Sequence, residues 1–352
     1  MLGCIPALAL TAFLLAALRG GPLSDAEVDV VSSAAQIWPH AKLLIADLKP
    51  GSSTGCPGAG HALLAGFLRI FGASPFAARL PSVLAAFGLL GITYLLARRL
   101  SDHITGLVAA IALLCTTGVL TAACTVNIYL PAAFCIGGSA LLYLEADRGT
   151  TTISQAAVPL AVLAAVLAAL IQGPSGLLIP AFALVAFHAA ERNLGPLWRP
   201  VLLISALGAL AVIGAWISFL GLSMGQDASD GMSFFFRAQA PGTPEHTGLA
   251  ILAAVKGLFV TALPISLLAP FALFAHLKIR RYREDLGFGD RRWRLPKATL
   301  LAGMAALAVA PAAQPATQEG AVLSLLPFLA VLVASWLVFA IRSRRGRSAA
   351  AG

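Results

Sequence analysis

The stretch Leu80–Ala97, LPSVLAAFGLLGITYLLA, contains no charged side chain and is followed directly by Arg98 and Arg99. The run is apolar throughout and shows no alternation of polar and apolar residues. It predicts an α-helix that crosses a bilayer, because about 20 mainly apolar residues are needed to span the hydrocarbon. The two arginines mark the end of the helix that faces water. Blocks of the same kind recur along the chain and decide its fold class.

The other apolar blocks are also rich in Ala and Leu, which favours helices over the strands of a closed barrel. We expect an all-α membrane protein with about ten transmembrane helices, of which the remaining nine are Leu2–Leu18, Ile104–Leu120, Ile128–Leu144, Ile153–Ile171, Gly176–Ala189, Val201–Leu222, Leu249–Phe274, Ala298–Ala312 and Ala321–Ile341. We interpret Leu2–Leu18 as an uncleaved first span, because no convincing small-x-small cleavage site follows it. The block His61–Phe71 is too short to cross and predicts an interfacial or re-entrant helix.

Composition excludes a soluble protein. Apolar residues make up 59% of the chain, charged residues 11%, and the mean hydropathy is +0.88, whereas soluble domains carry about 25% charged residues. The formal charge of +9 sits mostly at the ends of the expected helices. Because no basic patch is interleaved with exposed aromatic residues, we expect contact with membrane lipids and no nucleic-acid binding.

The distribution of Lys and Arg predicts the topology of a single polytopic domain over residues 1–352. With both termini in the cytoplasm and His61–Phe71 not crossing, most basic residues fall on the cytoplasmic side, chiefly in the loop 278–297 and the tail 342–352. Asp25, Asn127, Gln172 and Asp230 then face outward. We expect a multi-pass protein of the plasma membrane or the cell inner membrane.

The first outer loop, residues 19–79, is long for a helical membrane protein. It carries Asp25, Glu27, Asp29 and Asp47, followed by a stretch rich in Gly, Pro and Ser. We expect it to form two short juxtamembrane helices lying against the outer ends of the spans, with a groove between loop and spans. Chemistry is expected on this face, since function concentrates in long loops.

Two interpretations of the first acids remain open. Pro22, Ser24 and Asp25 look like a helix start, with Ser24 or Asp25 as N-cap and an acidic first turn that suits the helix dipole. Alternatively, Asp25 and Glu27 supply a general base or hold a divalent cation, which the sequence does not require. Likewise, Asn127 is either a helix cap or part of a site. The histidines and cysteines show no metal-ligand spacing, and no nucleotide-binding motif is present.

A longer motif resembles a known family. The run Phe71-Gly-Ala-Ser-Pro-Phe-Ala-Ala-Arg-Leu-Pro-Ser82, then a span, then Tyr94-Leu-Leu-Ala-Arg-Arg-Leu100, is similar to polytopic lipid-linked-sugar glycosyltransferases of the protein O-mannosyltransferase and aminoarabinose transferase type, the GT-C superfamily. The resemblance covers roughly residues 21–190. A fainter similarity at Leu326-Pro327 matches the late Leu-Pro of that family.

The resemblance implies transfer of a sugar from a polyprenyl-phosphate carrier to a lipid or glycan acceptor on the outer face. Ser24-Asp25-Ala26-Glu27 stands where the family has Asp-Glu-Ala, with Asp25 at the Glu position, or at the Asp position after a one-residue slip. Asp25 and Glu27 are therefore the candidate catalytic residues, with no certain cofactor. The candidates for carrier and substrate binding are Arg79, Lys49, Asn127 and Gln172.

The chain departs from the family pattern at charged positions. Asn127 stands where the family has an acid, and Gln172-Gly173-Pro174 stands for a Lys-Gly-Pro that can meet the carrier phosphate. Cys56-Pro57-Gly58 replaces Lys-Pro-Pro or His-Pro-Pro. These changes favour, as an alternative, a catalytically inactive relative that acts as an accessory or lipid-binding subunit. A transporter is a third alternative, although only Lys256 lies well inside an expected span.

Overall fold

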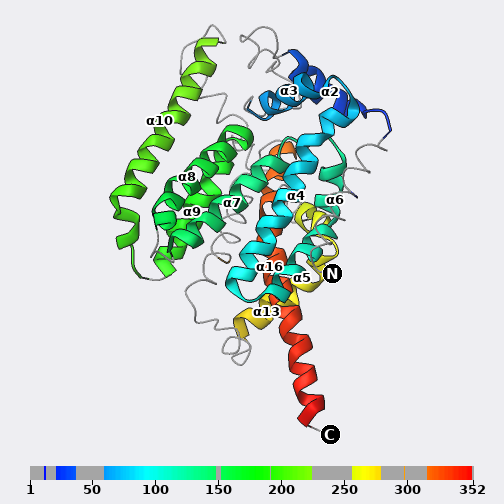
Figure 1. The fold of residues 1–352 in the computed structure, drawn as a ribbon, viewed down its shortest axis with the longest axis vertical. Coiled ribbons are helices and arrows are strands. Elements are labelled where there is room, and N and C mark those ends of the chain that lie inside the picture. The colour runs from blue at the N-terminus through cyan, green and yellow to red at the C-terminus, as the bar shows by residue number, and fades with distance from the viewer. Residues whose placement is uncertain are drawn as a thin grey trace, which may run out of the picture.

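The computed structural model describes residues 12, 21–36, 59–147, 152–190, 192–223, 256–278, 297 and 315–350. Within these ranges every regular element is a helix (Figure 1), which confirms the all-α fold. The elements are α2 Asp25–Gln36, α3 Ala59–Phe71, α4 Pro75–Leu100, α5 His103–Leu114, α6 Thr117–Cys124, α7 Leu130–Asp147, α8 Thr152–Gln172, α9 Pro174–Ala190, the 3₁₀ helix η2 Gly195–Trp198, α10 Pro200–Ser223, α13 Ile265–Lys278 and α16 Pro315–Ala350.

Helix α4 contains the stretch that predicted the fold. Its boundaries follow from local chemistry: the Ser74 side chain accepts a hydrogen bond from the Ala77 amide at 3.2 Å, Pro75 occupies the first turn, and Arg98 and Arg99 lie in the last. This arrangement satisfies a free amide at the start and places cations at the negative end of the helix dipole. The helix therefore begins and ends where the sequence signals stand.

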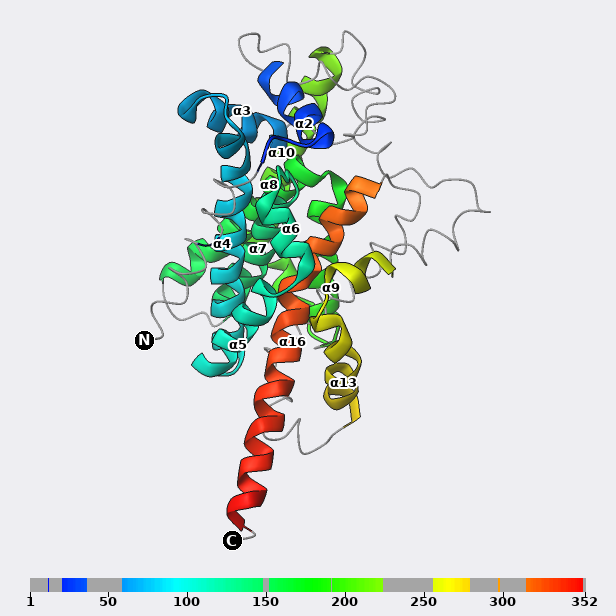
Figure 2. The same cartoon turned by 90° about the vertical axis from the view of Figure 1, so that its right-hand side faces the viewer.

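Helix α16 passes through the centre of the bundle, beside α4, α5 and α7 (Figures 1 and 2). Its side chains enter two apolar clusters at once: Phe328 belongs to the cluster shared with α7 to α9, and Leu326 to the cluster shared with α4 to α6. A helix buried on several sides in this way reads as apolar all round. This accounts for the uniform hydrophobicity of Ala321–Ile341.

The expected number of spans is not confirmed. Among the described residues, three helices are long and apolar enough to cross a membrane by length and composition, within Pro75–Leu100, Pro200–Ser218 and Val322–Ser343, and a bent helix pair makes a fourth. The expected spans Leu2–Leu18 and Ala298–Ala312 lie outside the described residues, apart from Ala12. Leu249–Phe274 is described only from Lys256.

The expected single span Ile104–Leu120 is wrong in one respect. The chain breaks between α5 and α6 and bends by 63°, because Thr116 leaves the helical conformation and its hydroxyl bonds back to the Leu113 carbonyl at 2.6 Å. The Thr117 amide then donates to the Leu263 carbonyl at 2.9 Å. A distant segment thus satisfies the backbone group that the break sets free.

The first outer loop contains the two short helices that the sequence predicted. Helices α2 and α3 pack on each other and on the start of α4 through an apolar cluster that includes Ala34, Leu64 and Ala77. The block His61–Phe71 is the short helix α3, and Gly72, at φ +81°, turns the chain into α4. At its other end, a Cβ on Gly60 would lie 3.3 Å from Ile128 and 3.4 Å from Ile171. The loop therefore rests on the ends of α7 and α8.

The two ends of the bundle differ in composition. One end carries α2, α3 and the turns at Asn127 and Gln172, which the contacts of Glu27 and Gly60 bring together. The opposite end carries the last turn of α4 and the ion pairs Arg342–Asp102 and Arg99–Glu145. Asp25, Asn127 and Gln172 thus share one end, as predicted, while Asp230 lies outside the described residues.

Candidate functional site

The start of α2 is a capping box formed by Ser24 and Glu27. The Glu27 amide donates to the Ser24 hydroxyl at 3.4 Å, and the Glu27 carboxylate accepts from the Ser24 amide at 3.0 Å and from its hydroxyl at 3.1 Å. Such reciprocal bonds satisfy the free amides of a first turn. Ser24 is therefore the N-cap, and the first of the two open interpretations holds for Glu27.

The same carboxylate forms a buried ion pair with Arg79 of α4. The Arg79 Nε lies 3.0 Å from Glu27 Oε1 and Nη2 lies 3.1 Å from Oε2, a bidentate geometry, with both side chains less than a tenth exposed. The Val126 amide donates to Oε1 at 3.0 Å, and Arg79 also donates to the Gly21 carbonyl at 3.3 Å. One carboxylate thus joins α2, α4 and the turn before α7.

This environment lowers the pKa of Glu27. Burial alone would raise the pKa, but the hydrogen bonds from Arg79, Ser24 and Val126 and the charge of Arg79 stabilise the carboxylate more strongly and bring the pKa to about 2. With donors on both oxygens, Glu27 is a weak proton acceptor at neutral pH. In this structure Glu27 and Arg79 bind each other, and neither is presented to a substrate.

Asp25 is placed differently from Glu27 although it lies on the same first turn. Its side chain is exposed, whereas Glu27 is buried, because positions two apart on a helix face different sides. The one-residue ambiguity of the sequence comparison therefore has a structural counterpart. Asp25 is the first-turn acid that remains accessible, and Glu27 is the acid that holds the loop.

Asn127 caps α7. Its side-chain oxygen accepts from the amides of Tyr129 at 2.9 Å and Leu130 at 3.0 Å, and its own amide donates to the Ser82 hydroxyl at 2.9 Å. The cap interpretation of Asn127 thus describes its geometry. Ser82, the last residue of the Arg-Leu-Pro-Ser motif, contacts Asn127 from α4, a link that the spacing did not predict.

Gln172 ends α8 and is 1% exposed. Its amide nitrogen donates to the Ser175 hydroxyl at 3.1 Å, and its oxygen accepts from the Ser324 hydroxyl of α16 at 3.4 Å. Gly173, at φ +85°, supplies the left-handed turn that ends the helix. A Cβ on Gly320 would lie 2.9 Å from the Tyr129 ring and 3.1 Å from the Gln172 amide carbon, so Gly320 is required for this close approach.

These contacts bring most of the predicted residues to one end of the bundle. Glu27, Arg79 and Asn127 are linked through the segment 126–127, and Gln172 packs near Tyr129 in the next turn of the chain. Lys49 lies outside the described residues. No three His, Cys, Asp or Glu side chains converge as a metal site would need within the described part of the chain. The sequence analysis missed Ser82, Tyr129, Ser175 and Ser324, because single Ser and Tyr residues in apolar blocks carry no motif.

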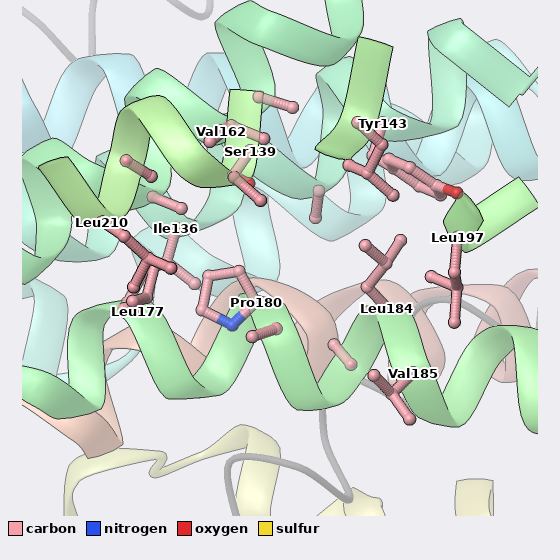
Figure 3. Close-up of a pocket in the computed structure, with 18 of the residues that line it drawn as sticks. Ile136, Ser139, Tyr143, Val162, Leu177, Pro180, Leu184, Val185, Leu197 and Leu210 are labelled. Carbon is pink, nitrogen blue, oxygen red and sulfur yellow. The ribbon is translucent and has the colours of Figure 1, made fainter. Parts of the chain in front are cut away.

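A cavity of about 340 Å³ lies elsewhere, between α7, α8, α9 and α10 (Figure 3). Its walls are almost entirely aliphatic, with Ser139 and Tyr143 as the polar side chains. None of the sequence-predicted site residues lines it. The predicted groove between the first loop and the spans is thus a separate feature from this cavity.

Comparison with known proteins confirms the family resemblance. Residues 57–219 match the family model described as dolichyl-phosphate-mannose-protein mannosyltransferase. No curated protein sequence matches the chain.

Two solved structures share the fold. The crystal structure of ArnT from Cupriavidus metallidurans bound to undecaprenyl phosphate superposes with a TM-score of 0.72 at 15% identity, over 93% of this chain and 58% of ArnT. The apo structure of the same enzyme gives 0.70 at 16% identity, over 93% and 57%. The chain thus spans less than two thirds of the length of ArnT and has the same helical membrane fold.

Proposed function

We propose that this chain, on a fold shared with ArnT, is a membrane glycosyltransferase that moves a sugar from a polyprenyl-phosphate carrier to a hydroxyl group of a lipid or glycan acceptor. The match of residues 57–219 to a family named for a polyprenyl-phosphate-type sugar donor carries the proposal. The polar residues gathered under α2 and α3 supply a place for the reaction. The ArnT structure with undecaprenyl phosphate adds the carrier class.

The outer face is the proposed side of transfer. Arg98, Arg99 and Arg342 lie at the end of the bundle opposite to α2, α3 and Asn127. Basic residues concentrate on the cytoplasmic side of membrane proteins. By this rule both termini are cytoplasmic and the first loop faces outward.

Asp25 is the proposed general base. The acceptor hydroxyl oxygen attacks the anomeric carbon of the sugar, the bond from that carbon to the phosphate oxygen breaks, and the polyprenyl phosphate leaves with the bonding electrons. Asp25 accepts the proton of the hydroxyl. Its exposure supports the assignment, and the tight bonding of Glu27 argues against the neighbouring acid.

Carrier binding is proposed for the same end. Lys49 supplies a cation for the phosphate, and Arg79 adds its positive charge through the Glu27 pair. Gln172 and Asn127 hold the turns over which the donor lies, through their contacts with Ser324 and with the first amides of α7. The acids of α2 need no divalent cation in this scheme.

The test is a transfer assay with purified protein and a panel of synthetic polyprenyl-phosphate pentoses and hexoses, with released undecaprenyl phosphate quantified by mass spectrometry. Asp25→Asn is expected to lower the rate by roughly 10² to 10⁴, the usual cost of losing a general base. Asp29→Asn, an exposed acid one turn further on α2, is the matched control and should retain activity. Equal rates in wild type and Asp25→Asn would refute the base.

A second function is favoured by the neutral residues at two positions. Gln172 and Asn127 replace a cation and an acid of the family pattern, and both are occupied by structural hydrogen bonds. These features favour a relative that binds the lipid carrier without transfer. Wild type that binds undecaprenyl phosphate but transfers no sugar, together with activity gained in Gln172→Lys/Asn127→Asp, would identify this accessory role.

A further inference from the structure

The cavity between α7 and α10 is an elongated apolar slot. It is lined by Leu177 to Val185 on α9 and by Leu202 to Leu210 on α10. Eight residues of helix rise about 12 Å, so the slot follows these two helices for roughly that length. Figure 3 shows Leu177 and Leu210 at one end, and Leu197 with the Tyr143 hydroxyl at the other. Its volume falls within the range of ligand pockets.

The slot is accessible from the side of the bundle. Helix α10 packs on α8 and presents much of its apolar surface outward, and the lining residues Val185 and Leu210 are themselves 49% and 62% exposed. In a bilayer this face meets hydrocarbon. A chain that enters the slot therefore comes from the lipid and lies parallel to the helices.

One end of the slot continues into polar surroundings. A smaller cavity of about 30 Å³ shares Tyr143 and Leu202 with the slot and is lined by Arg199. Arg199 is exposed, and no carboxylate pairs with it in the portion of the chain that the structure describes. The Tyr143 hydroxyl is hydrogen-bonded to Nε2 of the buried His188, which holds the ring in the wall where the two cavities meet.

The polar end has the character of a membrane interface. Trp198, beside Arg199, is 73% exposed. Exposed Trp and basic residues mark the headgroup level. This end also follows the last turn of α9, so it lies away from Gln172 and from the donor site proposed above, which is near the start of α9.

We propose that the slot binds one acyl chain of an anionic diacyl phospholipid of the cytoplasmic leaflet, with the lipid phosphate on Arg199. The length and apolar lining of the slot suit the chain, and the unpaired guanidinium at its polar end suits the phosphate. The site is distinct from the outer-face donor site. It gives the peripheral helix α10 a lipid partner where the protein leaves a void.

The experiment measures binding of phosphatidylglycerol and phosphatidylcholine to delipidated, purified protein by native mass spectrometry. Wild type is expected to prefer phosphatidylglycerol. Arg199→Ala should weaken phosphatidylglycerol retention about fivefold, equivalent to roughly 1 kcal/mol for one basic side chain near an anionic surface, and leave phosphatidylcholine unchanged. Arg98→Ala removes an exposed arginine that lines neither cavity, and should behave as wild type.

Ala206→Phe tests the slot itself, because Ala206 lines it and a phenyl ring there would displace the acyl chain. Retention of both phospholipids should fall. If Ala206→Phe weakens binding of undecaprenyl phosphate instead, the slot holds the donor's chain and the proposal is overturned. Should Ala206→Phe fail to fold, Arg199→Ala against Arg98→Ala decides, and equal retention in these two variants overturns the proposal.

Discussion

The two ends of the bundle use ion pairs in opposite ways. At the first-loop end, the Glu27–Arg79 pair has side chains 8% and 5% exposed and joins α2 to α4. At the other end, the side chains of Arg99 and Glu145 are 49% and 30% exposed, and those of Arg342 and Asp102 are 55% and 34% exposed. A buried pair is costly to break, because one charge stays behind without its partner. An exposed pair is hydrated in either state and contributes little.

The largest expected effect comes from breaking the buried pair. Arg79→Ala should lower the free energy of unfolding by about 3–5 kcal/mol, because it leaves the Glu27 carboxylate buried without its cation. Denaturant unfolding in detergent, followed by circular dichroism, measures the change. Arg99→Ala is the matched control at the opposite end and should cost no more than about 1 kcal/mol. Equal losses would mean that burial does not distinguish the two pairs.

The pH dependence of stability tests the same pair without removing it. The pKa of Glu27 is lowered from 4.5 to about 2 in the folded protein, so its contribution is present above pH 4.5 and is lost as the pH falls towards 2. The shift corresponds to about 3 kcal/mol. Unfolding measured across this window should show that slope in wild type. A slope of the same size in Glu27→Gln would assign it to other groups.

A smaller effect is expected at the Asn127 cap. Asn127→Ala should cost about 1 kcal/mol of unfolding free energy, because the first amides of α7 lose their acceptor. Asn127→Asp keeps an acceptor in place and should unfold like wild type, measured by the same denaturant titration. The control matters for function, because aspartate restores the acid of the family pattern. A destabilised Asn127→Asp would show that the cap does not tolerate the charge.

The smallest effect is expected for Arg342→Ala. Asp102 keeps its second task, accepting the Thr105 amide at 2.8 Å as the N-cap of α5, so loss of the exposed arginine should change the unfolding free energy by no more than about 1 kcal/mol. Added salt should reduce the difference further. A loss approaching that of Arg79→Ala would remove the contrast between the two ends.

Local signals predicted the elements well. Ser74, Pro75 and Arg99 delimit α4, and the shortness of His61–Phe71 predicted a helix that does not cross. Helix capping and hydrophobic length act within a few residues of the chain, so a pattern in the sequence records them. The break at Thr116 was not predicted, because its amide partner, Leu263, lies far along the chain.

The roles of the candidate residues divide along the same line. By itself, the sequence determined that this is a helical membrane protein, that its first loop forms two juxtamembrane helices, and that acids gather at the start of the first of them. Only the tertiary structure decided that Glu27 binds Arg79 while Asp25 stays exposed, and that Ser324 meets Gln172. Those contacts depend on which helices pack together, and no spacing along one helix specifies the partner on another.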